Sequence, residues 1–325
     1  MRVTKLIAVL LAAAAFVQAP FAAAADKATL RLNWLFSGLN LPYYLGVTKG
    51  YYAAENIDLT ILEGRGSGIA VQAVGAKSET FGTADAASII AGVIKGVPIV
   101  TVMSTYGNAG WAVIARSDRG ISKIKDIEGK TVAVTAGDAL SQLFPDVVAI
   151  NKLDASKVRL AYMDPTAKLA AVIAGKADAL MAHMAGEGVR IRRAGVAVKI
   201  IPFSDVGVEQ VGVSVMAHTD TVRDNPALVR RFVKATQSAW DDALRNPEGA
   251  IEAYAKTKPD VNRSLTLEEL KMAADLIRVP ETRDKPIGFG SPRGWESTLE
   301  IMKKYRDLKT DLPSTAFYVN RFISD

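Results

Sequence analysis

The 325-residue sequence contains no cysteine and only two histidines, His183 and His218. The absence of cysteine excludes disulfides, thiolate nucleophiles and cysteine-ligated metal ions. A histidine-ligated metal or a catalytic triad would have to use one of the two histidines, and neither has a second histidine at ligand spacing. We interpret both as structural residues or residues at the rim of a pocket. We therefore predict a protein that is not an enzyme, with no catalytic residue, no metal site and no cofactor.

Long apolar segments are missing after the first 25 residues. The chain begins with two basic residues, Arg2 and Lys5, an apolar run over residues 6–17 and three alanines at 23–25. This order is typical of a cleaved secretory signal peptide, whereas a membrane anchor, the alternative, needs about 20 apolar residues. We therefore predict a signal peptide over residues 1–25 and a periplasmic mature protein. No cysteine follows the alanines, which excludes a bacterial lipoprotein.

Strong charge of one sign is missing as well. The 40 Lys and Arg side chains are opposed by 34 Asp and Glu side chains, which gives a net charge of +6. The basic residues are scattered, and the one dense stretch, Arg190–Arg193, is interpreted as a solvated helix face. We therefore predict no nucleic-acid partner. The roughly 300 residues left after signal-peptide cleavage are enough for two domains of about 150 residues each.

The rest of the chain alternates short β segments with helical segments and becomes entirely helical from residue 225. This alternation predicts an α/β fold with mostly parallel sheets. The expected strands are 29–33, 58–63, 79–83, 97–104, 111–117, 130–135, 158–163, 179–182, 198–203 and 211–217. The expected helices before residue 225 are 41–54, 69–76, 86–95, 140–150 and 166–175. Farther along, Thr266-Leu267-Glu268-Glu269 fits a capping box that opens a helix.

A loose internal recurrence indicates two lobes built on the same plan. The segments DLTILEG (58–64) and TVAVTAG (131–137) are both expected strands that lead into glycine turns. Chain order then gives one lobe, a second lobe inserted into it, and a return to the first. Because open α/β sheets bind ligands at the carboxyl ends of their strands, we expect the two glycine turns on opposite sides of one cleft.

The first glycine turn, LEGRGSG (62–68), raises the question of a nucleotide site. The dinucleotide fingerprint needs G-x-G-x-x-G after a first strand, and a phosphate loop needs Gly-Lys-Ser/Thr; Gly64, Gly66 and Gly68 satisfy neither pattern. What remains is a helix start at which Gly66-Ser67-Gly68 would present N–H groups and a hydroxyl to a carboxylate, sulfonate, phosphate or ring carbonyl. The alternative is a tight turn that needs glycine for its geometry alone.

Aromatic and acidic residues also lie next to expected strand ends. Trp34 and Phe36 follow the first strand, where a Trp either stacks on a flat ligand or packs in the core. Asp85 and Asp164 each precede a helix and are interpreted as N-caps. Glu187 has no such explanation, and it would accept a hydrogen bond from an amine or a ring N–H of a ligand.

Five segments taken together resemble the NMT1/THI5-like periplasmic solute-binding proteins, which include SsuA-like and nitrate/taurine-like members. In chain order they are GVTKGYYAAENIDLTILEG, FGTADAASIIAGVIKGVPIV, IKDIEGKTVAV, AGKADAL and FYVNRFI. The resemblance implies a type II periplasmic-binding-protein fold, an α/β fold of two lobes with a two-segment hinge. Lobe 1 would comprise residues 26–107 plus 214–325, and lobe 2 would comprise residues 108–213.

The resemblance also implies a function, partners and a site. The protein would be the monomeric substrate-binding protein of an ABC importer, which captures a small solute between its lobes and delivers it to a permease with its ATPase. In the family, the pocket uses the loops after the first three strands and the first loop of the inserted lobe. The matching residues here are Trp34, Ser37, Asn40, Gly66, Ser67, Gly68, Ala84, Asp85, Tyr106, Gly137, Asp138, Ala139 and Glu187.

The resemblance leaves the solute open. Pyrimidine-binding relatives often carry a Trp-x-Pro-Asn motif with a nearby His-Ala, and this chain has neither next to Trp34. Sulfonate-binding relatives use a Ser or Thr with main-chain donors, a role open to Ser37, Ser67 and Thr135. We favour a pyrimidine-type or other aromatic solute because of Trp34, Phe36 and Tyr106, with a sulfonate next.

Two other functions stay open at this stage. A periplasmic subunit that presents its ligand to a membrane receptor needs the same pair of closing lobes. A THI5-like pyrimidine synthase that works on pyridoxal phosphate would need a Schiff-base lysine, a nearby histidine and cysteine-rich iron binding. The absence of cysteine, and of any histidine before His183, disfavours the synthase.

Overall fold

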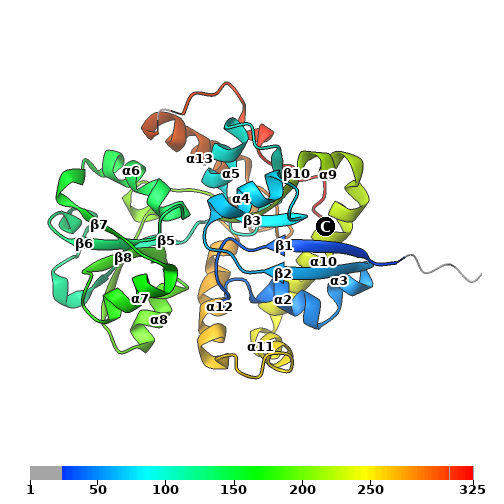
Figure 1. Cartoon of the computed structure of the whole chain (residues 1–325), viewed down its shortest axis with the longest axis horizontal. Helices are drawn as coiled ribbons and strands as arrows, with labels where there is room; N and C mark the ends of the chain where they lie inside the picture. The colour runs from blue at the N-terminus through cyan, green and yellow to red at the C-terminus, as the bar shows by residue number, and fades with distance from the viewer. Residues whose placement is uncertain (1–23, 307, 325) are drawn as a thin grey trace, which may run out of the picture.

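The computed structural model describes residues 24–306 and 308–324, and it consists of two α/β lobes that lie side by side (Figure 1). The predicted signal peptide lies outside the described residues except for its last two positions. Each lobe is built on a five-stranded sheet with helices packed against it. None of the helices within these ranges combines the length and the apolar composition of a membrane span.

The sheet of lobe 1 has the strand order β2-β1-β3-β10-β4. Its strands are β1 (Asp26–Arg31), β2 (Ile57–Leu62), β3 (Phe81–Asp85), β4 (Ile99–Met103) and β10 (Val213–His218). Strand β1 is parallel to β2 and β3, whereas β10 is antiparallel to β3 and β4. Every residue of the central strand β3 is buried, as expected for a strand covered on both faces.

The sheet of lobe 2 has the strand order β7-β6-β8-β5-β9. Its strands are β5 (Trp111–Arg116), β6 (Thr131–Val134), β7 (Arg159–Tyr162), β8 (Ala179–His183) and β9 (Val198–Pro202). Strand β6 is parallel to β7 and β8, and β5 is antiparallel to β8 and β9. Order and directions repeat those of lobe 1, so the two lobes share one plan.

The two glycine turns do not occupy equivalent positions in the shared plan. Strand β6 takes the place of β1 in the repeated order, and β7 takes the place of β2. The turn after β6 (TAGDA) is therefore the counterpart of the loop after β1, which carries Trp34. The turn after β2 (LEGRGSG) is the counterpart of the loop after β7. The recurrence correctly indicates a repeated plan, although β6 is the second strand of its sheet and β2 is an edge strand.

The helices connect the strands and then complete lobe 1. They are α2 (Leu41–Thr48), α3 (Tyr51–Ala54), α4 (Ser67–Gly75), α5 (Ala86–Ile94), α6 (Ala139–Asn151), α7 (Pro165–Ile173), α8 (Glu187–Arg193), α9 (Thr219–Asp224), α10 (Pro226–Arg245), α11 (Pro247–Ala255), α12 (Arg263–Ile277) and α13 (Pro292–Tyr305). The single helix expected over 41–54 is two helices, since Gly50 between them has a φ of 75°.

The predicted capping box at Thr266 is wrong. Helix α12 begins at Arg263, and the Asn262 side chain caps it by accepting a hydrogen bond from the Leu265 amide at 3.1 Å. Asn262 provides the cap one turn earlier, so Thr266 and Glu269 are buried within the helix. The pattern that resembles a cap belongs to an interface between the lobes.

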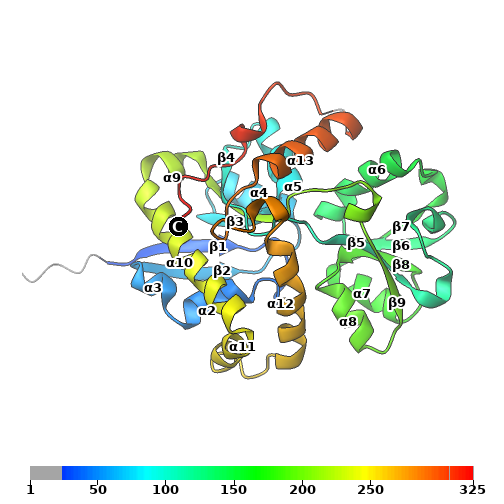
Figure 2. The same ribbon diagram turned by 180° about the vertical axis from the view of Figure 1, so that it is seen from behind.

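Two chain segments cross between the lobes, one from β4 to β5 and the other from β9 to β10 (Figure 2). They are hydrogen-bonded to each other, since the Tyr106 amide donates to the Val213 carbonyl at 3.0 Å and the Gly212 amide to the Tyr106 carbonyl at 2.9 Å. The end of α12 is bonded to the first segment through Gly107, whose amide donates to the Ile277 carbonyl at 3.0 Å. The hinge thus has the two predicted segments, with α12 attached to one of them.

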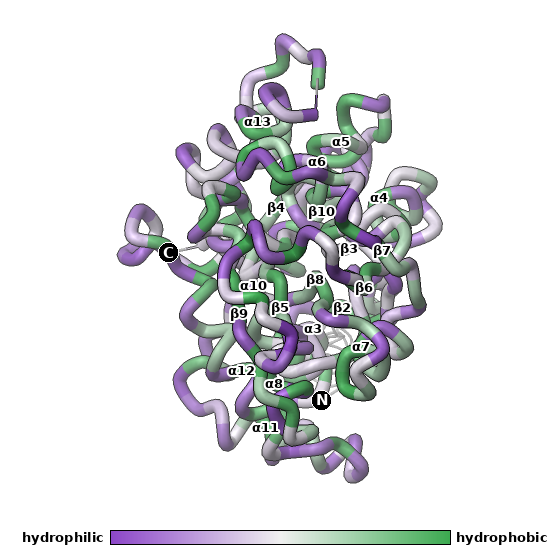
Figure 3. The backbone as a smooth tube through the Cα atoms, turned by 90° about the vertical axis from the view of Figure 1, so that its left-hand side faces the viewer, coloured by the Kyte–Doolittle hydropathy of each residue, from purple (hydrophilic) through white to green (hydrophobic). Residues whose placement is uncertain are grey.

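Each lobe has an apolar core of its own on its sheet. In lobe 1 the rings of Phe81 and Phe232 stack with centroids 3.8 Å apart, and both side chains are fully buried together with Trp240. In lobe 2 the core contains Val132 and Leu143. Figure 3 shows hydrophobic stretches toward the middle of the molecule and many hydrophilic residues in the outer loops. Two separate cores allow each lobe to keep its shape while the hinge moves.

Candidate functional site

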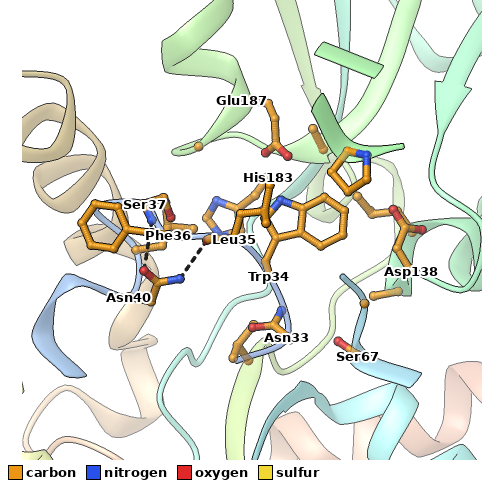
Figure 4. A pocket seen from close by; sticks show the side chains of 18 of the residues that line it. Asn33, Trp34, Leu35, Phe36, Ser37, Asn40, Ser67, Asp138, His183 and Glu187 are labelled. Atoms are coloured by element: carbon orange, nitrogen blue, oxygen red, sulfur yellow. Dashed lines mark hydrogen bonds between the residues drawn. The ribbon is translucent and has the colours of Figure 1, made fainter. Parts of the chain in front are cut away.

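A cavity of about 120 Å³ lies between the two lobes, where the parallel strands of both sheets end (Figure 4). Lobe 1 contributes the loop after β1, the start of α4 and the first hinge segment. Lobe 2 contributes the turn after β6, helix α7, the end of β8 and helix α8. The predicted site residues that line the cavity are Trp34, Ser37, Asn40, Gly66, Ser67, Tyr106, Asp138, Ala139 and Glu187.

The loop after β1 is held against the ends of β2 and β3. The Asn33 amide donates to Thr83 Oγ1 at 2.8 Å, and the Thr83 hydroxyl donates to Asn33 Oδ1 at 3.0 Å. From the other side, the Gly64 amide donates to the Trp34 carbonyl at 3.1 Å, and the Gly66 amide to the Asn33 carbonyl at 2.8 Å. These bonds fix the backbone on either side of Trp34, so the indole projects into the cavity from a rigid base.

The glycine turn LEGRGSG therefore has a different role from the one its donors suggest. Two of its amides are used by the loop after β1, and a Cβ added to Gly64 would lie 1.8 Å from the Leu32 carbonyl oxygen. Gly64 is thus required for close packing of two loops. Gly66 and Ser67 still line the cavity, and at Ser67 the first-turn amides of α4 have no partner within the helix. The interpretation as a tight turn that needs glycine for its geometry therefore holds for Gly64, in the first half of the turn.

Three predicted residues of lobe 1 use their polar groups to shape the wall. Asn40 accepts from the Ser37 amide at 3.0 Å and donates to the Leu35 carbonyl at 3.0 Å (Figure 4). The Tyr106 hydroxyl donates to the Leu39 carbonyl at 2.6 Å. Both groups hold the loop after β1 in its bent form. Phe36, also in this loop, stacks on Tyr254 with ring centroids 5.1 Å apart.

The indole of Trp34 faces a buried ammonium group from the other lobe. Lys168, on α7, has a side chain that is 1% exposed, and its Nζ lies 5.0 Å from the centre of the Trp34 ring. That Nζ also donates to the Met181 carbonyl at 3.1 Å and lies 3.8 Å from an Asp138 oxygen. Lys168 was not among the predicted site residues. The one available signal was a lysine on the face of α7 that also carries Ala171 and Val172.

Asp138 has two roles at the turn after β6. Its side chain caps α6 by accepting from the Ser141 amide at 2.7 Å, and only 4% of the residue is exposed. Burial raises the pKa of this carboxyl group, and the Lys168 ammonium opposes the rise. The pair places one negative and one positive group beside each other on the wall formed by lobe 2.

His183 ends β8 and lines the cavity as a neutral ring. Burial lowers the pKa of His183 to about 4. Its Nδ1 accepts from the Ala185 amide at 3.2 Å, so Nε2 carries the proton of the neutral ring. The ring packs edge-on against Trp111, with centroids 5.6 Å apart. His183 is thus both a structural residue and a residue at the rim of the pocket, the two roles expected for it.

Glu187 begins α8, and its carboxylate points into the cavity toward Trp34 (Figure 4). Among the described residues, the Glu187 carboxylate makes neither a hydrogen bond nor an ion pair. Arg190, one turn later, does not belong to a solvated helix face as predicted, because its Nε lies 2.6 Å from Glu269 and its Nη2 donates to the Phe36 carbonyl at 3.2 Å. Arg190 is therefore neutralised by Glu269, which leaves Glu187 as the carboxylate without a protein partner.

Four predicted residues do not line the cavity: Gly68, Ala84, Asp85 and Gly137. Ala84 is fully buried in β3, and Asp85 caps α5 by accepting from the Ser88 amide at 3.0 Å, as the N-cap interpretation predicts. Gly137 lies where the two lobes touch, since a Cβ on Gly66 would lie 3.1 Å from the Gly137 carbonyl oxygen. The two glycine turns thus face each other, as expected, at the edge of the cavity.

Ion pairs join the lobes on several sides of the cavity. Arg65 of the first glycine turn lies 2.5 Å from Asp164, which also caps α7. On another side, Arg306 at the end of α13 lies 2.7 Å from Asp146, a fully buried residue of α6. The structure therefore has its lobes closed over the cavity. Within the described ranges, no three His, Cys, Asp or Glu side chains come together as a metal site.

Comparisons with known proteins identify one family and several similar proteins. Residues 40–250 match the sequence profile of the family described as NMT1/THI5 like. The chain is 24% identical over 308 residues to the riboflavin-binding protein RibY of Chloroflexus aurantiacus, covering 92% of this chain and 86% of that protein. It is 24% identical over 285 residues to the Saccharomyces cerevisiae 4-amino-5-hydroxymethyl-2-methylpyrimidine phosphate synthase THI5, covering 82% of each.

A solved structure shows the same fold. The alkanesulfonate-binding protein SsuA from Xanthomonas axonopodis pv. citri, bound to MOPS, superposes with a TM-score of 0.70 at 15% identity, covering 91% of this chain and all of that chain. The predicted family and the predicted two-lobed fold are both confirmed.

Proposed function

The chain belongs to the NMT1/THI5-like family, and from this premise we propose that it is the periplasmic substrate-binding protein of an ABC importer. The solute it captures is a single planar ring that carries N–H donors. The partnerless carboxylate of Glu187 in an aromatic-walled cavity is the observation that carries the proposal. Closure of the lobes over that solute presents it to a membrane permease.

The size and walls of the cavity favour one ring. A cavity of about 150 Å³ is known to hold benzene, and the cavity here is about 120 Å³. Trp34 supplies a flat apolar wall, and aromatic rings pack on such a wall in stacked or edge-on geometry. A three-ring solute would require the lobes to close less far than they do in this structure.

The charges of the cavity favour a donor-rich solute over an anion. Asp138 is offset by Lys168, and Arg190 is offset by Glu269. Glu187 is half-buried, and its carboxylate has neither a hydrogen bond nor an ion pair among the described residues, so it is available to accept from a ligand. An amino group or ring N–H would satisfy it. A sulfonate would instead place a second anion beside it, so the sulfonate alternative is the weaker one.

The names of two relatives refer to nitrogen heterocycles. One is named for making an aminopyrimidine phosphate, which has a single ring, and the other for binding riboflavin, whose three-ring system is larger than the solute proposed here. The solved sulfonate-binding protein shares the fold at 15% identity. The aminopyrimidine class is therefore the first to test.

A thermal-shift screen tests the proposal directly. The probes are aminopyrimidines, nucleobases, aromatic acids and alkanesulfonates of similar size. A solute present at about 100 times its Kd stabilises the folded state by about 2.7 kcal/mol, so a binder raises the melting temperature clearly. We expect aminopyrimidines to do so and sulfonates not to. A shift with sulfonates alone would overturn the proposed solute class.

Turnover is the second candidate function, because Lys168 and His183 lie in the same cavity and a relative is a synthase. We propose binding without turnover, since the chain has no cysteine for the iron chemistry expected of that synthase. Mass spectrometry of the solute after long incubation separates the two functions. Recovery of unchanged solute supports binding, and its loss in wild type but not in Lys168→Met would establish catalysis.

The membrane partner distinguishes a subunit that presents its ligand to a receptor from the binding protein of an importer. Purified permease with its ATPase, reconstituted in vesicles, should take up the solute only when this protein is present. A protein that binds the solute but supports no uptake would favour the sensing role.

A further inference from the structure

Helix α8 of lobe 2 and helix α12 of lobe 1 are joined at the cavity by an ion pair between the buried carboxylate of Glu269 and the half-buried Arg190, whose side chain is 31% exposed. Arg190 Nε lies 2.6 Å from Glu269 Oε1, and the Glu269 side chain is only 1% exposed. The other Glu269 oxygen accepts from the Gly38 amide at 2.7 Å. Arg190 also donates to the Phe36 carbonyl at 3.2 Å. One charge pair therefore contacts both lobes and two backbone groups of the loop after β1.

The loop is pressed closely onto α12 at this point. A Cβ added to Gly38 would lie 2.2 Å from the Thr266 carbonyl oxygen and 2.6 Å from the Glu269 Cβ. No side chain fits there, so the Gly38 amide reaches the buried carboxylate directly. The same loop carries Trp34 at its start, so its position decides where the aromatic wall of the cavity stands.

The pair is also connected to the other wall and to the hinge. Helix α8 begins with Glu187, one turn before Arg190. Helix α12 ends at the first hinge segment, where the Asn108 amide donates to the Leu276 carbonyl at 3.0 Å. A buried carboxylate that loses its cationic partner is strongly disfavoured. Separation of the lobes therefore removes Arg190 from Glu269, the residue that also holds the loop through its bond to the Gly38 amide.

We propose that Arg190 and Glu269 are positioning residues that hold the Trp34-bearing loop of lobe 1 in register with α8 of lobe 2. The aromatic wall and the Glu187 wall then reach their final arrangement together, when the lobes close. Neither residue needs to touch the solute for this role. This positioning role does not depend on which solute enters the cavity.

A matched control lies on the same two helices. Arg193 Nε lies 2.7 Å from Glu268, and both side chains are 38% exposed. This exposed pair joins α8 to α12 but does not contact the loop after β1. Exposed ion pairs contribute little. Replacing Arg193 removes the same charge from the interface as replacing Arg190, and it leaves the Arg190–Glu269 pair in place.

The first test measures exchange in the solute-free protein. Hydrogen exchange of the Gly38 amide, followed by NMR, reports the loop from within lobe 1. Arg190→Gln changes only lobe 2, and we expect it to speed exchange of this amide about tenfold or more. Arg193→Gln should leave it unchanged, and Arg190→Lys, which keeps the charge without the fork, should fall between. Equal exchange in Arg190→Gln and Arg193→Gln would overturn the proposal.

The second test measures lobe closure and covers the case in which a variant is unstable. Because the chain has no cysteine, Lys95→Cys and Lys199→Cys accept a spin label each without background, one per lobe. Electron–electron resonance then gives the distance distribution between the lobes. Arg190→Lys should broaden it toward longer distances, and Arg193→Lys should not. A distribution unchanged by Arg190→Lys, with slow Gly38 exchange, contradicts the proposal even if solute binding is later confirmed.

Discussion

The two lobes share one sheet plan but contribute opposite kinds of chemistry to the cavity. The lining residues of lobe 1 are aromatic, aliphatic, hydroxyl or amide side chains and glycine. The lining residues of lobe 2 include the ionisable groups Asp138, Lys168, His183, Glu187 and Arg190. A repeated fold therefore does not repeat its site, because the chemistry lies in loops whose sequences are independent of the sheet.

The polar groups of the two walls also differ in what they bind. In lobe 1, Asn40 and Tyr106 both bond to the backbone of the loop after β1. In lobe 2, the Glu187 carboxylate has no partner within the described chain, and His183 has its Nε2 proton to offer. Under the proposed function, we expect lobe 1 to offer a fixed surface for stacking and lobe 2 to offer the groups that recognise an edge of the ring. A solute would then contact both walls only after closure.

The first prediction compares the same substitution in the two glycine turns, one from each lobe. Gly64→Ala in lobe 1 places a Cβ 1.8 Å from the Leu32 carbonyl oxygen, so we expect a loss of about 4 kcal/mol or more in the free energy of unfolding. Gly137→Ala in lobe 2 has open space around the Cβ but a φ of 76°, and should cost about 1–2 kcal/mol. Urea denaturation measures both. Equal losses would show that packing does not distinguish the turns.

The second prediction concerns pH and the histidine in the wall formed by lobe 2. The folded pKa of His183, about 4, lies below its ordinary value of 6.5. As pH falls, the unfolded chain therefore takes up the proton first, and stability is lost between pH 6.5 and 4. The shift corresponds to about 3 kcal/mol. Wild type should lose this much more than His183→Gln when urea denaturation at pH 7 is compared with pH 4.

His218 of lobe 1 is the control for this measurement. Its Nδ1 also accepts a backbone amide, that of Asp220 at 3.0 Å, and burial lowers its pKa as well, while the Asp220 carboxylate opposes that change. His218→Gln should therefore alter the pH dependence less than His183→Gln. The same pH slope in wild type and in His183→Gln would contradict the assignment of a buried neutral ring.

The third prediction concerns the Glu187 carboxylate in the wall formed by lobe 2. Glu187→Gln should weaken binding of an aminopyrimidine by about 1.5–3 kcal/mol, the usual contribution of a hydrogen bond to a charged group. Stability of the free protein should stay the same, because the carboxylate has no partner among the described residues. Isothermal titration measures the affinity, with Glu268→Gln as a control outside the cavity. A loss of affinity in both variants would point to general charge and not to the site.

The smallest expected effect concerns the aromatic wall. Trp34→Leu keeps an apolar side chain but removes the ring, and we expect about 0.5–1.5 kcal/mol less affinity for a planar solute. A saturated ring of the same size should be bound equally by wild type and by the variant. Competition between the two solutes measures the difference. An equal loss for both solutes would assign Trp34 to packing alone.

Much of the fold could be predicted from the sequence, because its signals are local. Strands such as 131–134 and long helices such as α10 show their periodicity within one segment, and the order of segments predicts the inserted lobe. The errors came from signals that were local but misleading. Thr266 and Glu269 have the spacing of a cap, although Asn262 caps the helix and Glu269 binds across the lobes.

The site was easiest to predict where a residue lies in the loop that follows a strand. Trp34, Ser67 and Asp138 do so, and the structure brings them to one cavity; their contact with a solute stays a prediction. Lys168 and Arg190 lie within helices, where sequence shows neither which face is buried nor what faces it from the other lobe. The bond between Gly38 and Glu269 joins residues far apart in the chain, and no local pattern indicates it.

The contact between the two glycine turns has a consequence for rates. With the lobes closed, the Gly66 and Gly137 backbones lie against each other at the edge of the cavity, and Arg65 is paired with Asp164 beside them. If the proposed ring binds in this cavity, we expect it to pass this edge only when the lobes part. The frequency of opening would then limit the dissociation rate, and solutes of different affinity would leave at similar rates.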